Sequence, residues 1–273
     1  MMQISVMSYT LASRPELYAV ERYPEIIAAA GAHAVNWVTT YGERPERLRK
    51  LTLDAGLAVG AFTFALQSFR HGGTVREALA EAETRFTEAA ALQAPVVMIV
   101  PMPIDGLDDR NELRKRWCGL LPELAVLAKQ AGTVLTIEDF EGEKSAFVTA
   151  EDLLTAYAAE PSLRFTFDIG NAAMGGDEIA AAAALNGLIS YVHCKDFYIA
   201  NAPQENAARG LDGRFYRAAP VGQGDVKIVE TAQVIADGGY TGFADIEYIG
   251  RAEEPAEAIK TAAAWMRSTE LFE

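Results

Sequence analysis

The 273-residue chain alternates between two kinds of segment. Short apolar runs rich in β-branched residues are each followed by a longer stretch rich in Ala, Leu, Glu and Arg. Most of the short runs are nearly continuous in apolar residues, which is typical of parallel strands buried on both faces. We expect eight such strands, at residues 3–11, 32–40, 57–66, 94–101, 133–140, 163–171, 189–197 and 242–248.

The longer stretches carry the start and stop signals of helices. Residues 16–30 are followed by a glycine, and residues 74–92 begin with a threonine that suits an N-cap. A further helix is expected at residues 108–131, where Pro122 predicts a kink or a division into two pieces. Strands and helices therefore alternate from one end of the chain to the other.

Eight strand and helix units in a chain of this length match a (β/α)₈ TIM barrel, which typically has about 250 residues. A doubly wound open sheet would more often carry a glycine-rich phosphate turn after its first strand, and the segment after Leu11 has none. No linker or internal repeat divides the sequence, so we expect one α/β barrel domain over residues 1–273.

One connection is much longer than the others. Residues 198–225 form a stretch of 28 residues without clear periodicity. Loops of this length are commonly lids or binding loops. Near its end, Gly222 to Asp225 indicates a turn that finishes in an N-cap for the following helix.

Composition excludes several classes of protein. With 38 acidic and 24 basic residues the formal charge is −14, which disfavours a nucleic-acid partner. Two cysteines, Cys118 and Cys194, make neither a disulfide framework nor a Cys-rich zinc site. No apolar run approaches the roughly 20 residues of a membrane span, and the first residues do not resemble a signal peptide. We therefore predict a cytoplasmic protein with no membrane partner; a homo-oligomer stays compatible with the sequence.

Ionisable side chains stand at the ends of four of the last predicted strands. They are Glu138, Asp168, His193 and Glu247. Active sites of TIM barrels lie at the C-terminal ends of the strands. Because side chains alternate between the two faces of a strand, all four point into the barrel mouth if their apolar neighbours pack outward against helices. We expect three carboxylates and one imidazole to converge there.

Converging carboxylates repel one another, and a divalent cation would compensate that repulsion. A single acid at a strand end is more often a cap or an ion-pair partner, so the prediction of a metal site depends on all four residues occurring together. Three oxygen ligands and one nitrogen favour Mn²⁺, Mg²⁺ or Co²⁺, whereas zinc more usually brings a second histidine or a thiolate. We expect one ion held by the four residues, favour Mn²⁺, and keep Mg²⁺, Co²⁺ and Zn²⁺ as alternatives.

Five short motifs occur in order at or near successive strand ends. Together they resemble the sugar phosphate isomerase/epimerase family, the xylose isomerase-like TIM barrels, over essentially the whole chain. The resemblance implies that Glu138, Asp168, His193 and Glu247 are the metal ligands and that, as in the epimerase branch, the two glutamates are the acid/base pair. It also implies that Lys195 meets the substrate. The motifs are IEDF (137–140), DIGN (168–171), VHCKD (192–196), GQGD (222–225) and IEYIG (246–250).

The chain departs from the family pattern at particular positions. Many members have a histidine where this chain has Asn171, which would either donate to a substrate hydroxyl or serve as a turn residue. On the second predicted strand, Asn36 stands where many members have a glutamate. The AP endonuclease branch needs several more histidines than this chain offers, since it has only His33 and His71 besides His193. That branch is excluded.

The chemistry of these residues suits carbohydrate metabolism. A metal that chelates a carbonyl and its neighbouring hydroxyl makes the adjacent C–H more acidic and stabilises an enediolate. Glu138 would remove the proton and Glu247 would return it, so we expect a sugar isomerase or epimerase. The alternative is a dehydratase of the inosose or 3-dehydroshikimate type on the same metal site. A non-catalytic carbohydrate-binding barrel is the less favoured third hypothesis.

Basic residues in the long connection bear on the substrate. Arg209, Arg214 and Arg217 make residues 207–220 locally basic in an acidic chain. Arginine in such a place is usually only solvated, but Arg217 is a candidate contact for a phosphorylated or carboxylated sugar.

Overall fold

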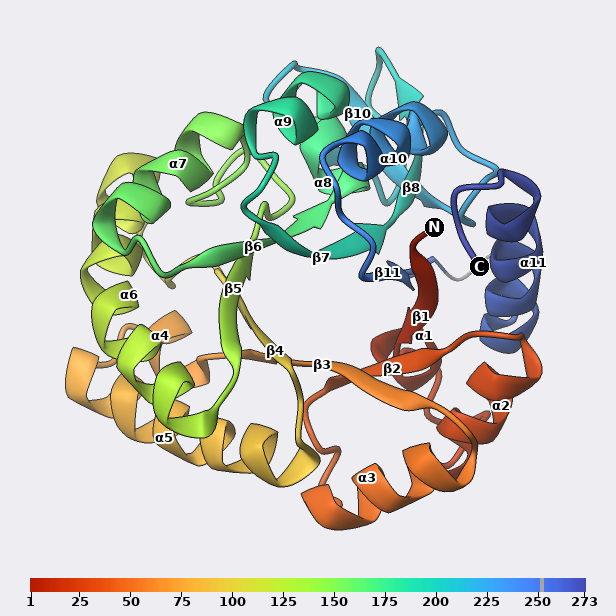
Figure 1. The fold of residues 1–273 in the computed structure, drawn as a ribbon. Helices are drawn as coiled ribbons and strands as arrows, with labels where there is room; N and C mark the ends of the chain where they lie inside the picture. Colours follow the sequence, from red (N-terminus) through yellow and green to blue (C-terminus); the bar gives the residue numbers. More distant parts are fainter. Residues whose placement is uncertain (251–252) are drawn as a thin grey trace.

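A computed structural model describes residues 1–250 and 253–273. Eight parallel strands close into a barrel in the order β1-β11-β7-β6-β5-β4-β3-β2, and helices surround it (Figure 1). The predicted TIM barrel is confirmed. The barrel strands are β1 (Gln3–Met7), β2 (Ala34–Val38), β3 (Ala58–Ala65), β4 (Val96–Val100), β5 (Val134–Glu138), β6 (Arg164–Asp168), β7 (Ile189–Cys194) and β11 (Phe243–Ile246).

Side-chain alternation divides the core into two parts. Apolar residues such as Phe167 and Val192 belong to a large cluster that joins the strands to the surrounding helices. A much smaller cluster, around Tyr191, packs separately with Ala61 and Val96. Because most apolar side chains of the strands face the helices, the barrel interior is left largely to polar side chains.

Each predicted strand ends later than the observed one. Residues 169–171, for example, already belong to a helix.

The helices cover the outside of the barrel. Pro122 lies within α6, a single helix, so the expected division into two pieces is wrong. Pro122 faces solvent while Leu121 and Leu124 beside it are fully buried, and this packing keeps both halves on the barrel. The helix expected at residues 16–30 is reduced to a 3₁₀ turn and α2.

The helices have these bounds: α1 (Tyr9–Ala12), α2 (Tyr23–Ala29), α3 (Pro45–Asp54), α4 (Gln67–Arg70), α5 (Val75–Leu92), α6 (Arg110–Ala131), α7 (Ala150–Ala159), α8 (Ile169–Met174), α9 (Glu178–Ala184), α10 (Ile228–Asp237) and α11 (Pro255–Ser268), with the 3₁₀ turn at Val20–Arg22.

The long connection after β7 is a small sheet, so the expectation of an irregular loop is wrong. β8 (Asp196–Ala200), β10 (Phe215–Ala219) and β9 (Ala208–Arg209) form three antiparallel strands in that order. These strands are short and pair with each other rather than with the barrel, so the long apolar runs that mark the barrel strands are missing from their sequence.

Asp196 fastens this sheet to the turn that follows it. Its carboxylate accepts N–H groups from Gly222 (3.0 Å), Gly224 (2.8 Å) and Val226 (3.3 Å). The turn expected there is present, but the N-cap assigned to Asp225 is wrong. Helix α10 starts three residues later without a side-chain cap, and the Asp225 carboxylate instead accepts the N–H of Ile199.

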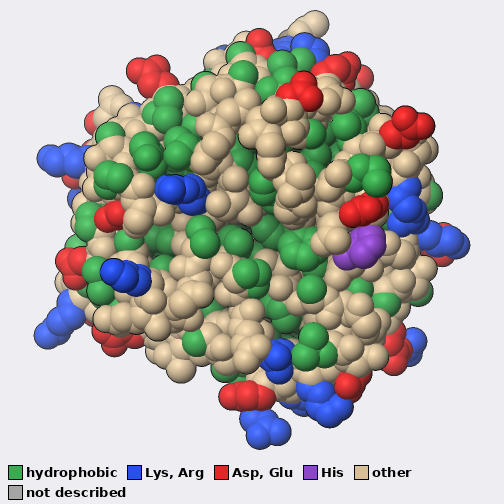
Figure 2. Space-filling view, in the orientation of Figure 1, with side chains coloured by type: hydrophobic (Ala, Val, Ile, Leu, Met, Phe, Trp, Pro, Cys, Tyr) green, Lys and Arg blue, Asp and Glu red, His purple; other side chains and the backbone are tan. Residues whose placement is uncertain are grey.

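The charge of the molecule lies mainly on its periphery. Figure 2 shows, in the orientation of Figure 1, that charged side chains gather around the rim while uncharged groups cover the middle of that face. Acidic and basic groups are interspersed along the rim. Within the described residues, no helix combines the length and apolar character needed to cross a membrane.

Candidate metal centre

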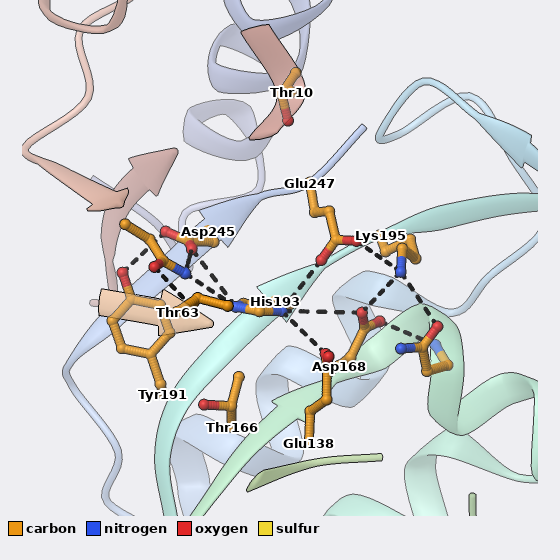
Figure 3. Close-up of polar contacts among 12 residues, drawn as sticks. Thr10, Thr63, Glu138, Thr166, Asp168, Tyr191, His193, Lys195, Asp245 and Glu247 are labelled. Carbon is orange, nitrogen blue, oxygen red and sulfur yellow. Dashed lines mark hydrogen bonds and ion pairs between the residues drawn. The ribbon is translucent and has the colours of Figure 1, made fainter. Parts of the chain in front are cut away.

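Four ionisable side chains meet inside the barrel mouth. Glu138 ends β5, Asp168 ends β6, His193 is the next-to-last residue of β7, and Glu247 directly follows β11. One potential ligand atom from each lies within 4.8 Å of the others, and none of the four residues is more than 6% exposed. Figure 3 shows the carboxylates arranged around the imidazole of His193. The structure thus brings together the four residues that the sequence singles out.

The backbone explains why these residues meet. Asp168 is the register partner of His193 on the adjacent strand, so both side chains point to the same side of the sheet. The N–H of Glu247 donates to the carbonyl of Cys194 at 3.1 Å, which continues the pairing with β7 beyond the end of β11. The next N–H, of Tyr248, donates to Thr10 Oγ1 at 3.2 Å. These bonds fix the backbone that carries Glu247.

The Nδ1 atom of His193 faces all three carboxylates. It lies 3.1 Å from Glu247 Oε2, 3.6 Å from Glu138 Oε2 and 4.0 Å from Asp168 Oδ2. Three of these atoms, His193 Nδ1, Glu247 Oε2 and Asp168 Oδ2, are buried without a hydrogen-bond partner. An unsatisfied buried polar group costs about 1–3 kcal/mol. Together, three carboxylates and one imidazole with unpaired atoms fit a divalent cation that accepts oxygen and nitrogen ligands.

Asp168 divides its two carboxylate oxygens between two tasks. Oδ1 accepts the N–H of Asn171 at 2.9 Å and caps helix α8, which leaves Oδ2 to the cluster. Asn171 is a helical residue of α8 and occupies no left-handed turn. Its Nδ2 donates to the carbonyl of Asp139 at 2.9 Å.

Lys195 supplies a positive charge at the edge of the cluster. Its buried ammonium lies 2.7 Å from Glu247 Oε1 and 3.4 Å from both Asp168 Oδ2 and Asn171 Oδ1. Burial alone lowers the pKa of Lys195, but Asp168 and Glu247 outweigh it and raise that pKa well above its usual value. The lysine therefore stays charged against Glu247.

The same surroundings move the carboxylates in opposite directions. Burial would raise the pKa of Glu247, but Lys195 and His193 outweigh it and bring the pKa to about 2. Burial raises the pKa of Asp168 to about 7, with Lys195 opposing the shift. With only protein charges around the cluster, Glu247 ionises readily, whereas ionisation of Asp168 costs free energy.

Arg217 lies apart from these groups, on strand β10. Its guanidinium stacks over the ring of Tyr198, with Cζ 4.7 Å from the ring centre. The other two arginines of the segment have acidic partners: Arg209 pairs with Glu143 and Arg214 with Asp212.

Two further buried acids next to the cluster, Asp139 and Asp245, were not singled out from the sequence. Asp139 accepts the N–H of Asp168 through Oδ1 at 3.0 Å, while its Oδ2 is buried without a hydrogen-bond partner. Burial, with Asp168 adding to it, raises the pKa of Asp139 well above its usual value. Asp245 lies on the other side of His193, with Oδ2 3.6 Å from Nε2. In the sequence Asp139 directly follows Glu138, and Asp245 precedes Glu247 by two positions. This spacing was the signal that could have indicated both acids.

Comparison with known proteins gives one family match. A family model described as "Xylose isomerase-like TIM barrel" matches residues 24–269. No curated protein matches the sequence.

Solved structures share the fold at low sequence identity. L-ribulose 3-epimerase has a TM-score of 0.77 and 16% identity, covering 98% of this chain and 94% of that one. The IOLI protein, solved with a zinc atom, has a TM-score of 0.75 and 16% identity, covering 98% of both chains. A probable 3-DHS dehydratase from Bacillus anthracis has a TM-score of 0.73 and 16% identity, covering 97% of this chain and 99% of that one. Such identities show the fold alone.

Proposed function

The chain belongs to the xylose isomerase-like TIM barrel family, and we propose that it is a divalent-metal-dependent isomerase or epimerase of a small sugar or sugar derivative. The observation that carries the proposal is the convergence of three carboxylates and one imidazole, some of whose buried atoms lack a hydrogen-bond partner, at the strand ends where TIM barrels carry their active sites. The presence of a sugar epimerase among the structural relatives supports it.

Glu138, Asp168, His193 and Glu247 would hold one ion, and Mn²⁺ is our preferred ion because three of the four ligands are hard oxygen donors. The ion would supply positive charge beside a substrate carbonyl and its neighbouring hydroxyl, which makes the adjacent C–H more acidic. All further steps fall to the protein's own side chains.

Two glutamates serve as the proton-transfer pair. Strands β6 and β7 lie between β5 and β11 in the barrel, so Glu138 and Glu247 reach His193 from different sides (Figure 3). Glu138 takes the proton as the substrate C–H bond breaks, and Glu247 returns one to the substrate carbon. Because the pKa of Glu247 is about 2, that proton reaches Glu247 from the Lys195 ammonium, 2.7 Å away, and exchange with solvent restores Lys195 and Glu138. Return to the opposite face of the same carbon is epimerisation, and return to the neighbouring carbon is isomerisation.

Lys195 and Asn171 complete the substrate site in this proposal. The Lys195 ammonium holds Glu247 in place and donates a hydrogen bond to a substrate oxygen, while Asn171 Oδ1 steadies the ammonium. Arg217 is proposed as a contact for an anionic substituent at the edge of the β8–β10 sheet. The ring of Tyr198 would hold its guanidinium for that contact.

Solvent deuterium tests the proposal directly. The Mn²⁺-loaded protein is incubated in D₂O with a panel of ketoses, ketose phosphates and inososes, and the recovered sugars are analysed by mass spectrometry. We expect deuterium in a recovered sugar without loss of water. Glu138→Gln should slow this exchange by about 10²- to 10⁴-fold, the usual contribution of a general base. Metal content is measured in parallel, since Glu138 is also a proposed ligand.

Glu143→Gln is the matched control, because Glu143 is an exposed glutamate paired with Arg209 outside the cluster. It should exchange deuterium at the wild-type rate. A dehydrated product would replace the proposal with the dehydratase alternative. Binding of a sugar with no exchange and no product would replace it with a carbohydrate-binding barrel. Unchanged exchange in metal-loaded Glu138→Gln would refute the role of Glu138.

A further inference from the structure

A second polar layer lies inside the barrel directly below the metal centre. Each of its residues on β5, β6, β7 and β11 precedes a cluster residue by two positions and so points to the same side of its strand. All four are buried, with at most 1% of their surface exposed. The function proposed above does not use them. They are Thr136, Thr166, Tyr191 and Asp245.

Asp245 is the carboxylate of this layer, and it faces His193. The two residues are register partners on the adjacent strands β11 and β7. Asp245 Oδ2 lies 3.6 Å from Nε2, whereas the cluster carboxylates surround Nδ1 at the opposite edge of the ring. Figure 3 shows the imidazole between Asp245 on one side and the cluster carboxylates on the other.

Hydrogen-bond donors hold the Asp245 carboxylate in place. Tyr191 donates its hydroxyl to Oδ1 at 2.9 Å, and Ser5 donates to the same oxygen. Asn36 donates from Nδ2 to Oδ2 at 2.7 Å. The orientation of the Asn36 amide is itself fixed, because its oxygen accepts the hydroxyl of Thr63 at 2.9 Å. The neighbours of Asp245 are donors, so the carboxylate acts as an acceptor.

The position of one proton on His193 decides whether Nδ1 can bind a cation. A neutral imidazole carries its proton on one nitrogen only. If Nε2 accepted a hydrogen bond from Asn36 Nδ2, 3.4 Å away, the proton would sit on Nδ1 and block it. If Nε2–H faces an acceptor, the Nδ1 lone pair is free for the ion. Asp245 Oδ2 lies 3.6 Å from Nε2, beyond hydrogen-bond distance, and its negative charge favours the proton on that nitrogen.

We propose that Asp245 is a positioning residue for His193: its carboxylate keeps the imidazole proton on Nε2 and the Nδ1 lone pair directed at the metal site. The inference rests on the proposed function, since it assigns His193 as a ligand. Partners of this kind behind a ligating histidine typically contribute 10- to 100-fold to metal affinity.

Metal affinity provides the first test. Mn²⁺ is titrated calorimetrically into the full chain after treatment with a chelator, for wild type, Asp245→Asn and Thr166→Val. The asparagine has the size of the aspartate but no negative charge, and an NH₂ replaces one of its two acceptor oxygens. We expect Asp245→Asn to bind Mn²⁺ about 10- to 100-fold more weakly. Thr166→Val is the matched control, because Thr166 lies in the same buried layer and bonds to Thr136 at 2.8 Å. It should bind like wild type.

Nitrogen NMR of the histidine side chains provides a second readout that a purely structural role would not change. The chain has only three histidines, and His33 and His71 are exposed, so His193 can be assigned. In the Mg²⁺-loaded wild type we expect a proton on Nε2 and none on Nδ1, and in Asp245→Asn the Nε2–H signal should shift, because the negative charge 3.6 Å from Nε2 is lost. This spectrum of the wild type decides the question if Asp245→Asn does not fold.

The outcomes separate this inference from the proposed function. Wild-type binding with equal affinity in Asp245→Asn would overturn the role of Asp245 and leave the metal site standing. A proton on Nδ1 of the loaded wild type would do the same. No divalent-ion binding by the wild type would overturn both.

Discussion

The two carboxylate oxygens of Asp168 have different roles at this site. One oxygen caps helix α8 and the other faces His193 without a hydrogen-bond partner. The position of an aspartate at a strand end could be read from the sequence. The division of its oxygens could not, because it depends on where α8 begins relative to β6.

Lys195 gives a prediction in which two measured quantities move in opposite directions. Its ammonium lies 2.7 Å from Glu247 Oε1 and 3.4 Å from Asp168 Oδ2, so it repels a cation bound by the same carboxylates. Lys195→Met should therefore bind Mn²⁺ more tightly, by about tenfold if the removed repulsion is near 1.4 kcal/mol. Deuterium exchange into substrate should nevertheless fall, because the variant removes the group proposed to contact the substrate.

Isothermal titration and the exchange assay on the same preparation check this prediction. Lys144→Met is the control, since Lys144 is an exposed lysine paired with Asp108, and it should change neither quantity. Weaker Mn²⁺ binding by Lys195→Met would show that the ammonium supports the ion site rather than opposing it.

At the scale of elements, the barrel strands were predictable and the sheet after β7 was not. Barrel strands bury both faces, so their sequences are apolar and stand out from the helices. Strands β8 to β10 contain both buried and partly exposed residues and pair with each other rather than with the barrel, as at Arg217 and Tyr198. Long-range contacts hold this sheet in place, such as those of Asp196 with Gly222 and Gly224, and no local sequence pattern indicates them.

Asp196→Asn tests how this sheet is held. The Asp196 Oδ2 atom accepts the N–H groups of both Gly222 and Gly224. Asp196 Oδ1 accepts the N–H groups of Phe197 and Val226. An amide has one acceptor oxygen, so the variant leaves one of these two sets of N–H groups unpaired, at a cost of about 1–3 kcal/mol per buried group. We expect faster hydrogen exchange at Gly222 and Gly224 or at Phe197 and Val226, read by mass spectrometry, with the amides of the barrel strands unaffected.

Asp225→Asn is the matched control in the same segment. Asp225 accepts a single N–H, from Ile199, and an asparagine oxygen can still accept it. Its exchange pattern should follow the wild type. Unchanged protection at all four amides, Gly222, Gly224, Phe197 and Val226, in Asp196→Asn would mean that other contacts hold the turn.

At the scale of the molecule, the barrel interior is the unusual part of the charge distribution. Charged side chains gather at the rim of the face that Figure 2 shows, whereas several buried carboxylates outnumber the buried bases His193 and Lys195 at one end of the barrel. These carboxylates are Glu138, Asp139, Asp168, Asp245 and Glu247.

The convergence of the four cluster residues could be predicted from the sequence, because a closed parallel barrel places the C-terminal ends of all its strands on one face. The polar layer that contains Asp245 could not be predicted, because its contacts join β11 to β7, β1 and β2. A bound cation would relieve the excess of buried negative charge and stabilise the folded chain by mass action, by about 2.7 kcal/mol at a hundredfold excess over Kd.

One divalent ion bound by Glu138, Asp168, His193 and Glu247 underlies the proposed chemistry. Calorimetric titration of Mn²⁺ into chelator-treated protein, with metal analysis after gel filtration, tests for that ion. We expect one Mn²⁺ per wild-type chain, a higher melting temperature when it is bound, and no bound ion in the double variant Asp168→Asn, His193→Ala. One retained Mn²⁺ per chain in that double variant, or none in the wild type, would contradict it.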